Sequence, residues 1–153
     1  MSVRLAVEDA AVAGFDHREL ARVIDAIDAT LHEIEAEGAR SLGSLRHAMA
    51  LLERLDRELP RHFAFEAGPG GSFAEALLRA PQLEARLASL REDHAPLREE
   101  VARLAGEARL AGTTPEAWAG VATRFRGFAA ALRRHESAED AVVAEALLTD
   151  EPA

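Results

Sequence analysis

Four stretches of this chain carry apolar residues at intervals of three and four, and a histidine keeps the same interval in each of them. An α-helix turns once every ~3.6 residues, so this spacing places the side chains on one face of a helix. The histidines in step with the apolar residues are His17, His62, His94 and His135. The spacing therefore predicts four amphipathic helices, each with one imidazole on its buried face.

Glutamate follows two of these histidines by one helical turn, at a position where the apolar face would otherwise continue. The pairs are His62 with Glu66 and His135 with Glu139. Burying a carboxylate costs several kcal/mol unless another group compensates its charge, and no arginine or lysine is in step with either glutamate. A metal ion is the compensating group that we expect.

A single histidine in a core position is more often satisfied by a hydrogen bond than by a metal. Four of them together with two glutamates favour the metal, and they exceed what one tetrahedral ion needs. The sequence therefore predicts a buried two-metal site with six ligands: His17, His62, Glu66, His94, His135 and Glu139. Phe63 and Phe65, next to His62, are expected to help exclude water.

The two remaining histidines are expected to lie outside this site. His32 directly follows a residue of its apolar face, which turns it about 100° away from that face. His47 likewise falls out of step with the apolar residues around it. Both are predicted to be solvated or boundary residues, because polar side chains are mostly exposed.

The composition predicts an all-α protein. The chain has 153 residues, 48% of them hydrophobic and 29% charged, which suits a single domain over residues 1–153. Alanine, leucine, glutamate and arginine are abundant, and no sustained alternating pattern indicates a strand. The absence of cysteine excludes disulfides, thiolate metal sites and cysteine-held iron-sulfur clusters. The absence of tyrosine excludes a tyrosyl radical or tyrosinate ligand.

The charge pattern argues against nucleic acid as a partner. The formal net charge is −9, and no basic run stands apart from acidic neighbours. No stretch approaches the ~18 apolar residues of a membrane span, and the first residues lack the apolar core of a signal peptide. We therefore expect a cytoplasmic protein that does not associate with membranes.

Glycine and proline predict where the helices begin and end. We expect Gly38 to end the first helix and Ser44 to cap the second. A short apolar segment should separate the second and third long helices. The expected elements cover about 15–37, 44–67, 73–78, 81–110 and 115–148.

Short connections between long helices predict an up-down-up-down bundle. In such a bundle, the His17 end of the first helix lies beside the His62 end of the second. His94 and His135 lie deeper within their helices. For all four to share one level, some helix must precede His17, so helical structure is expected from about Glu8 onward.

The order His, His-x-x-x-Glu, His, His-x-x-x-Glu on four helices resembles the hemerythrin-like (HHE cation-binding) domain family, over about residues 8–148. The resemblance implies a left-handed four-helix bundle with a non-haem di-iron centre. By match to the motif, the four histidines would be terminal ligands, and Glu66 and Glu139 would bridge the irons.

Two positions depart from the oxygen-carrying members of that family. The carriers typically have a second histidine four residues after the third ligand, where this chain has Arg98. The missing imidazole favours sensing, reaction with oxygen or peroxide, or storage over simple oxygen carriage. We expect the head of Arg98 to reach the surface or to pair with an acid. The carriers also often place an aspartate five residues after the fourth histidine, where Asp140 stands. Glu139 is preferred because it keeps the apolar register.

The ligand types separate this chain from ferritin-like bundles, which use Glu-x-x-His units that are absent here. By donor type, zinc and manganese also suit a histidine-rich site, and the resemblance favours two iron ions joined by an oxo or hydroxo bridge. Three functions remain open: a protein that binds oxygen, nitric oxide, peroxide or iron, a di-iron oxidase or peroxidase, and a metal-stabilised interaction module.

Overall fold

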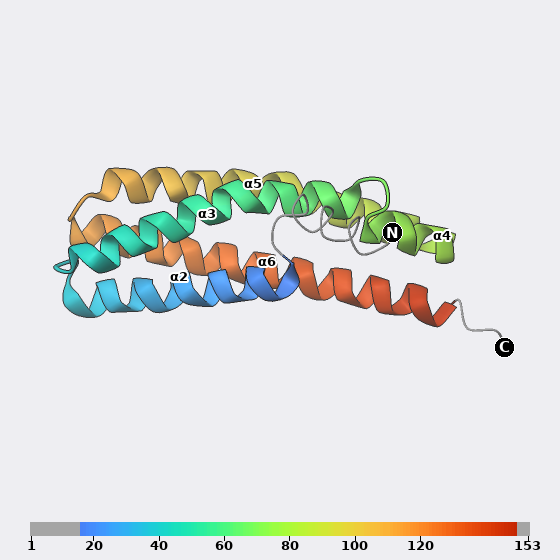
Figure 1. Cartoon of the computed structure of the whole chain (residues 1–153), viewed down its shortest axis with the longest axis horizontal. Coiled ribbons are helices and arrows are strands. Elements are labelled where there is room, and N and C mark those ends of the chain that lie inside the picture. Colours follow the sequence, from blue (N-terminus) through green and yellow to red (C-terminus); the bar gives the residue numbers. More distant parts are fainter. Residues whose placement is uncertain (1–15, 150–153) are drawn as a thin grey trace, which may run out of the picture.

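The computed structural model describes residues 16–149, and these form four long helices packed side by side with one short helix at an end of the bundle (Figure 1). The long helices are α2 (His17–Glu37), α3 (Leu42–Ala67), α5 (Glu84–Ala111) and α6 (Pro115–Thr149). The short helix α4 (Ser72–Arg79) and a 3₁₀ turn (Pro81–Leu83) connect α3 to α5. The expected helical structure from Glu8 falls outside the described residues.

The four long helices follow one another round the bundle in the order α2, α3, α5, α6. Helix α2 contacts α3 and α6, and α5 contacts the same two helices from the other side. Because consecutive helices are joined by short connections, neighbours run antiparallel (Figure 1). This arrangement confirms the all-α, up-down-up-down four-helix fold that the sequence predicted. None of the described helices is long and apolar enough to cross a membrane.

The ends of α2 follow from its flanking residues. The Asp16 carboxylate accepts a hydrogen bond from the Glu19 amide at 2.8 Å, and Gly38 ends the helix in the left-handed conformation, with φ of 62°. Glycine adopts that conformation at little steric cost, which explains why the helix stops where the sequence predicted.

The expected cap of α3 was wrong by one helical turn. Ser41 is the capping residue, and its hydroxyl oxygen accepts a hydrogen bond from the Ser44 amide at 3.3 Å. Ser44 is therefore the third residue of the helix. A serine oxygen can accept a hydrogen bond from the amide three residues later, so either Ser41 or Ser44 could cap a helix.

The hydrophobic core consists of two apolar clusters. One extends from the α2–α3 and α5–α6 connections to Phe63 and Leu132, and the other joins α4 to the start of α5 and the end of α6. Between them lies a layer of buried polar residues. Of the six buried polar residues in the described part of the chain, five lie in this layer: His62, Glu66, His94, His135 and Glu139.

Candidate metal centre

Glu66 lies at the middle of the polar layer and faces three histidines. Its Oε1 is 2.5 Å from Nε2 of His62 and 3.2 Å from Nε2 of His17. Its Oε2 is 3.7 Å from Nε2 of His94. The two oxygens of this carboxylate therefore face histidines from three different helices.

Glu66 belongs to two groups of donors, each compact enough to hold one metal ion. The first group is His17, His62, Glu66 and Glu136, and the second is Glu66, His94 and His135. Within each group the ligand atoms lie within 4.8 Å of one another. A third overlapping group is made of His135, Glu136 and Glu139. The first two groups each draw their donors from three helices, and together they use all four long helices.

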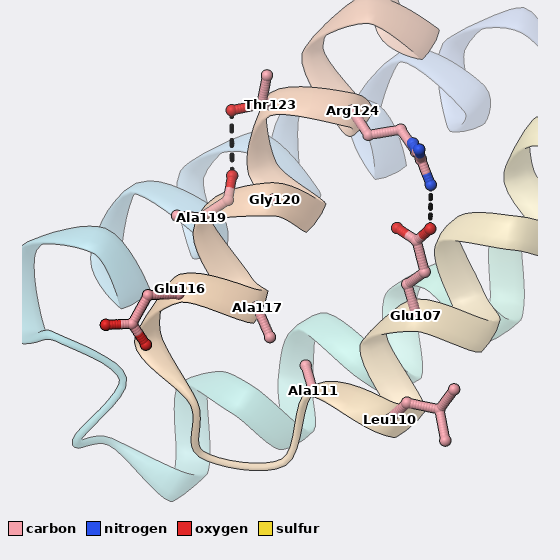
Figure 2. Close-up of a pocket in the computed structure, with 9 residues that line it drawn as sticks. All are labelled: Glu107, Leu110, Ala111, Glu116, Ala117, Ala119, Gly120, Thr123 and Arg124. Carbon is pink, nitrogen blue, oxygen red and sulfur yellow. Dashed lines mark hydrogen bonds and ion pairs between the residues drawn. The ribbon is translucent and has the colours of Figure 1, made fainter.

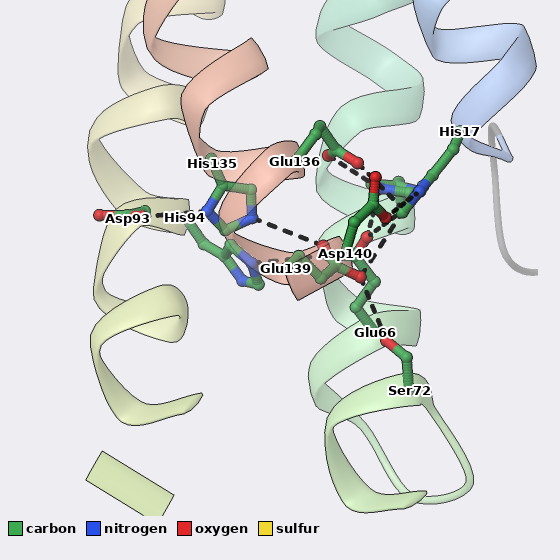
Figure 3. Close-up of polar contacts among 10 residues, drawn as sticks. His17, Glu66, Ser72, Asp93, His94, His135, Glu136, Glu139 and Asp140 are labelled. Atoms are coloured by element: carbon green, nitrogen blue, oxygen red, sulfur yellow. Dashed lines mark hydrogen bonds and ion pairs between the residues drawn. The ribbon is translucent and has the colours of Figure 1, made fainter. Parts of the chain in front are cut away.

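Glu139 is buried on the inner face of α6, where the apolar register placed it. Its Oε2 is 3.8 Å from Nε2 of His135, and its Oε1 is 3.6 Å from Nε2 of His17. Asp140, the alternative carboxylate, has a side chain that is 69% exposed, and its Oδ1 lies 3.5 Å from Nδ1 of His17. The hydroxyl of Ser72, at the start of α4, donates to Oε1 of Glu139 at 3.3 Å (Figure 3).

His17 is not buried, contrary to the expectation that all four histidines occupy core positions. Its side chain is 42% exposed, whereas those of His62, His94 and His135 are at most 9% exposed. The reason is its place in the first turn of α2, where no preceding turn of the described chain covers it. Its Nε2 nevertheless faces the carboxylates from the open side of the cluster (Figure 3).

Glu136 is the residue at this site that the sequence did not single out. Its Oε2 is 3.0 Å from Nε2 of His17, and its Oε1 is 3.5 Å from Nε2 of His62. It directly follows His135 and lies at the margin of the apolar face, four residues after Leu132 and three before Glu139. The available signal was the acidic pair it forms with Glu139, three residues later on the same side of the helix.

Four buried donor atoms of the cluster make no hydrogen bond within the described part of the chain. Among the described residues, Nε2 of His94 and His135 and Oε2 of Glu66 and Glu139 have no hydrogen-bond partner. Buried polar atoms are nearly always satisfied, so four such atoms at one place require an explanation. Imidazole nitrogens and carboxylate oxygens aimed at a common centre fit the ligand set of a transition-metal pair.

The glutamates around His17 and His62 raise the pKa of both histidines. Hydrogen bonds to Glu136, Glu139 and Glu66 raise the pKa of His17 to about 12. Burial acts to lower the pKa of His62, but hydrogen bonds to Glu136 and Glu66 outweigh it and raise the pKa to about 10. Burial also acts to raise the pKa of Glu66, but His17 and His62 hold it at about 2. Without a metal, protonated imidazoles compensate the carboxylates.

On the opposite side of the cluster, aromatic rings surround His94. Phe63 stacks on His94, with ring centroids 4.0 Å apart, and Phe73 lies 5.7 Å from it on α4. Burial, with the charge of His135, lowers the pKa of His94 to about 4. Phe63 therefore occupies the water-excluding position expected of it. Phe65 does not, because it points away from the core and is exposed.

The residues expected to lie outside the site do so. His32 and His47 are exposed, and Nδ1 of His32 lies 2.8 Å from the carbonyl oxygen of Asp28 in its own helix. Arg98 is also exposed, which agrees with the expectation that its head reaches the surface.

A separate groove of about 740 Å³ lies between α5 and α6 near their connection (Figure 2). Leu110 and the small residues Ala111, Ala117 and Gly120 line it, and an ion pair between Arg124 and Glu107 spans it. Glu107 is roughly 20 Å along α5 from His94, at ~1.5 Å per residue. None of the nine residues lining the groove is a histidine, so the groove offers no imidazole ligand.

Fold and cluster together define a four-helix metal-binding domain. The sequence model of the hemerythrin HHE cation-binding domain matches residues 15–147, and the chain belongs to this family. The match confirms the resemblance found in the sequence. No curated protein and no solved structure matches the chain.

Proposed function

We propose that this protein holds two iron ions and binds or reacts with oxygen, nitric oxide or peroxide, in an oxygen-binding, sensing or iron-handling role. The observation that carries the proposal is the position of Glu66 between two donor groups. Its Oε1 faces His17 and His62, while its Oε2 faces His94. A shared carboxylate of this kind suits two ions a few ångströms apart.

The donor groups divide between the two ions. His17, His62 and Glu136 would hold one ion and His94 and His135 the other. Glu66 and Glu139 would be shared between them, since Glu139 faces both His17 and His135. Glu136 is added to the six ligands predicted from the sequence because it contacts both His17 and His62. When bound, iron would supply one-electron chemistry and an affinity for small diatomic ligands.

The surrounding residues control access to the cluster. Phe63 and Phe73 cover His94, so this side excludes water. The partly exposed His17 side is where an ion or a small ligand would enter. Acidic groups concentrate there, with Glu136 and Asp140 beside His17, and their charge attracts cations.

The extent of the domain and the exclusion of nucleic acid as a partner are also proposed. Residues 1–153 would form one domain, with its bundle over about 8–148. The net charge of −9 supports the view that nucleic acid is not a partner.

The test is to load metal-free protein with ferrous iron in the absence of oxygen and then to expose it to air. We expect a new near-ultraviolet and visible absorption that develops only after exposure and that is lost in Glu66→Ala. Zinc loading is the matched control and should give no such change. An iron-loaded protein whose spectrum does not respond to oxygen, nitric oxide or peroxide would contradict the proposed reactivity.

A further inference from the structure

Asp93 contacts a buried histidine of the cluster from outside the cluster. Its Oδ2 lies 3.0 Å from Nδ1 of His135 (Figure 3). The two residues come from neighbouring antiparallel helices, α5 and α6. The side chain of His135 is 1% exposed and that of Asp93 is 50% exposed. The aspartate thus stands at the surface and reaches inward to one nitrogen of a buried ring.

The direction of this contact determines which nitrogen of His135 carries the proton. A carboxylate oxygen accepts a hydrogen bond, so Nδ1 must be the donor. In a neutral ring the other nitrogen, Nε2, then holds a lone pair. That atom is buried, has no hydrogen-bond partner among the described residues, and lies 3.8 Å from Oε2 of Glu139.

Two aromatic contacts fix the plane of the same ring. His94 meets it edge to face with centroids 5.0 Å apart, and Phe63 does so at 5.5 Å. These contacts limit the tilt of the ring but would also permit the orientation flipped by 180° about the Cβ–Cγ bond, in which a ring carbon takes the place of each nitrogen. Among the described residues, the hydrogen bond that His135 makes is the one to Asp93, and it favours the orientation with Nδ1 toward α5.

His17 has an aspartate in a similar place, but with a looser contact. Asp140 lies 3.5 Å from Nδ1 of His17, and both side chains are substantially exposed. Water competes for hydrogen bonds at such a position. The contact between Asp93 and His135 is shorter and involves a buried ring, so it can impose one tautomer.

We propose that Asp93 is a positioning residue that holds His135 with its proton on Nδ1 and its Nε2 lone pair directed at the carboxylates. Asp93 would not bind the metal. It would act through His135, by fixing the orientation and the tautomer of that ring before an ion arrives. The consequence for metal binding rests on the proposed function, whereas the tautomer does not.

Nitrogen NMR of the metal-free protein, at a pH where the His135 ring carries one proton, tests the tautomer directly. In the wild type we expect the proton on Nδ1. Asp93→Ala should move the ring toward the Nε2-protonated form, and Asp93→Asn should retain the Nδ1 proton because its amide oxygen still accepts. Asp25→Ala is the control, since it removes a 3.3 Å hydrogen bond to Arg133 that likewise joins another helix to α6.

Titration with ferrous iron in the absence of oxygen tests the consequence. Loss of such an outer partner typically weakens metal binding about 10–100-fold, so Asp93→Ala should do so, and Asp93→Asn should recover part of the loss. Asp25→Ala should leave binding unchanged. A wild-type ring protonated on Nε2, or an unchanged tautomer in Asp93→Ala, would overturn the inference. A shifted tautomer in a chain that binds no iron would support the inference and refute the proposed function.

Discussion

The ring of His94 lies almost parallel to that of Phe63, with an angle of 4° between the planes and 4.0 Å between the centroids. This stacking buries the imidazole and, with the charge of His135, holds its pKa at about 4. His17, on the open side, has a pKa of about 12 because three glutamates face it. At neutral pH one half of the cluster therefore offers a neutral imidazole, and the other offers an imidazole that must lose a proton before it can bind a metal.

Removal of a buried histidine should affect the protein, and removal of an exposed one should not. We expect His62→Ala and His135→Ala to weaken metal binding and to lower the free energy of unfolding by about 1–3 kcal/mol, because buried carboxylates lose their partner. His32→Ala and His47→Ala are the matched controls and should change neither. Metal titration and chemical denaturation measure both effects. Equal effects in all four variants would show that the buried cluster is not the metal site.

The adjacent carboxylates Glu139 and Asp140 provide a second matched pair. Glu139 is buried beside His135, while Asp140 is exposed on the outer side of His17. Glu139→Ala should weaken ferrous iron binding by at least tenfold, since ligand loss costs no less than the ~10-fold that loss of an outer partner costs. Asp140→Ala should have a clearly smaller effect. The reverse order, measured by competition with a chelator, would make Asp140 the ligand.

The turn between α3 and α4 should tolerate no side chain at Gly71. A Cβ there would lie 2.1 Å from the carbonyl oxygen of Phe65 and 2.5 Å from that of Glu66. Gly71→Ala must push α4 away and should break the contact from Ser72 to Glu139, at a cost of about 1–3 kcal/mol. Gly120→Ala is the control, because a Cβ there meets nothing within 4 Å. It should stabilise α6 by about 0.5–1 kcal/mol. Equal melting temperatures for the two variants would contradict this description of the turn.

The stability of the metal-free protein should fall as the pH rises above neutrality. The pKa of His62 is about 10 in the folded protein against 6.5 for an unperturbed histidine. Its contribution is therefore complete below pH 6.5 and is lost as the pH rises toward 10, because the folded state binds the extra proton. Denaturation between pH 6.5 and 10 should show this decline. His62→Gln should make the decline shallower, with His17 supplying the remainder, and His47→Gln should leave it unchanged. An unchanged slope in His62→Gln would assign the decline to other groups.

Much of the fold could be predicted from the sequence because its helices are amphipathic over their whole length. The spacing that includes Ile24, Leu55, Val101 and Phe125 identifies the buried faces, and all four residues are buried. The same spacing places His62, Glu66, His94, His135 and Glu139 in the interior. Periodicity reports the mean direction of a face, and that is enough to locate residues at its centre.

Residues at the margins of those faces could not be placed in the same way. Asp93 precedes His94 and Glu136 follows His135, and each is turned about 100° around the helix axis from its neighbouring histidine. They reach the cluster because several helices converge there, and periodicity within one helix does not report on the neighbouring helices. The exposure of His17 was missed for another reason: it lies in the first turn of α2, and periodicity does not report how well the end of a helix is covered.

The number of iron ions per chain tests the central claim most directly. Metal-free protein would be loaded with ferrous iron without oxygen, passed through a desalting column and analysed for iron and protein, with Glu66→Ala treated in parallel. The shared position of Glu66 predicts about two ions per wild-type chain and one or none in Glu66→Ala. A wild-type plateau at one ion, or a full complement of two in Glu66→Ala, would contradict the account of Glu66 as the carboxylate that joins two metal positions.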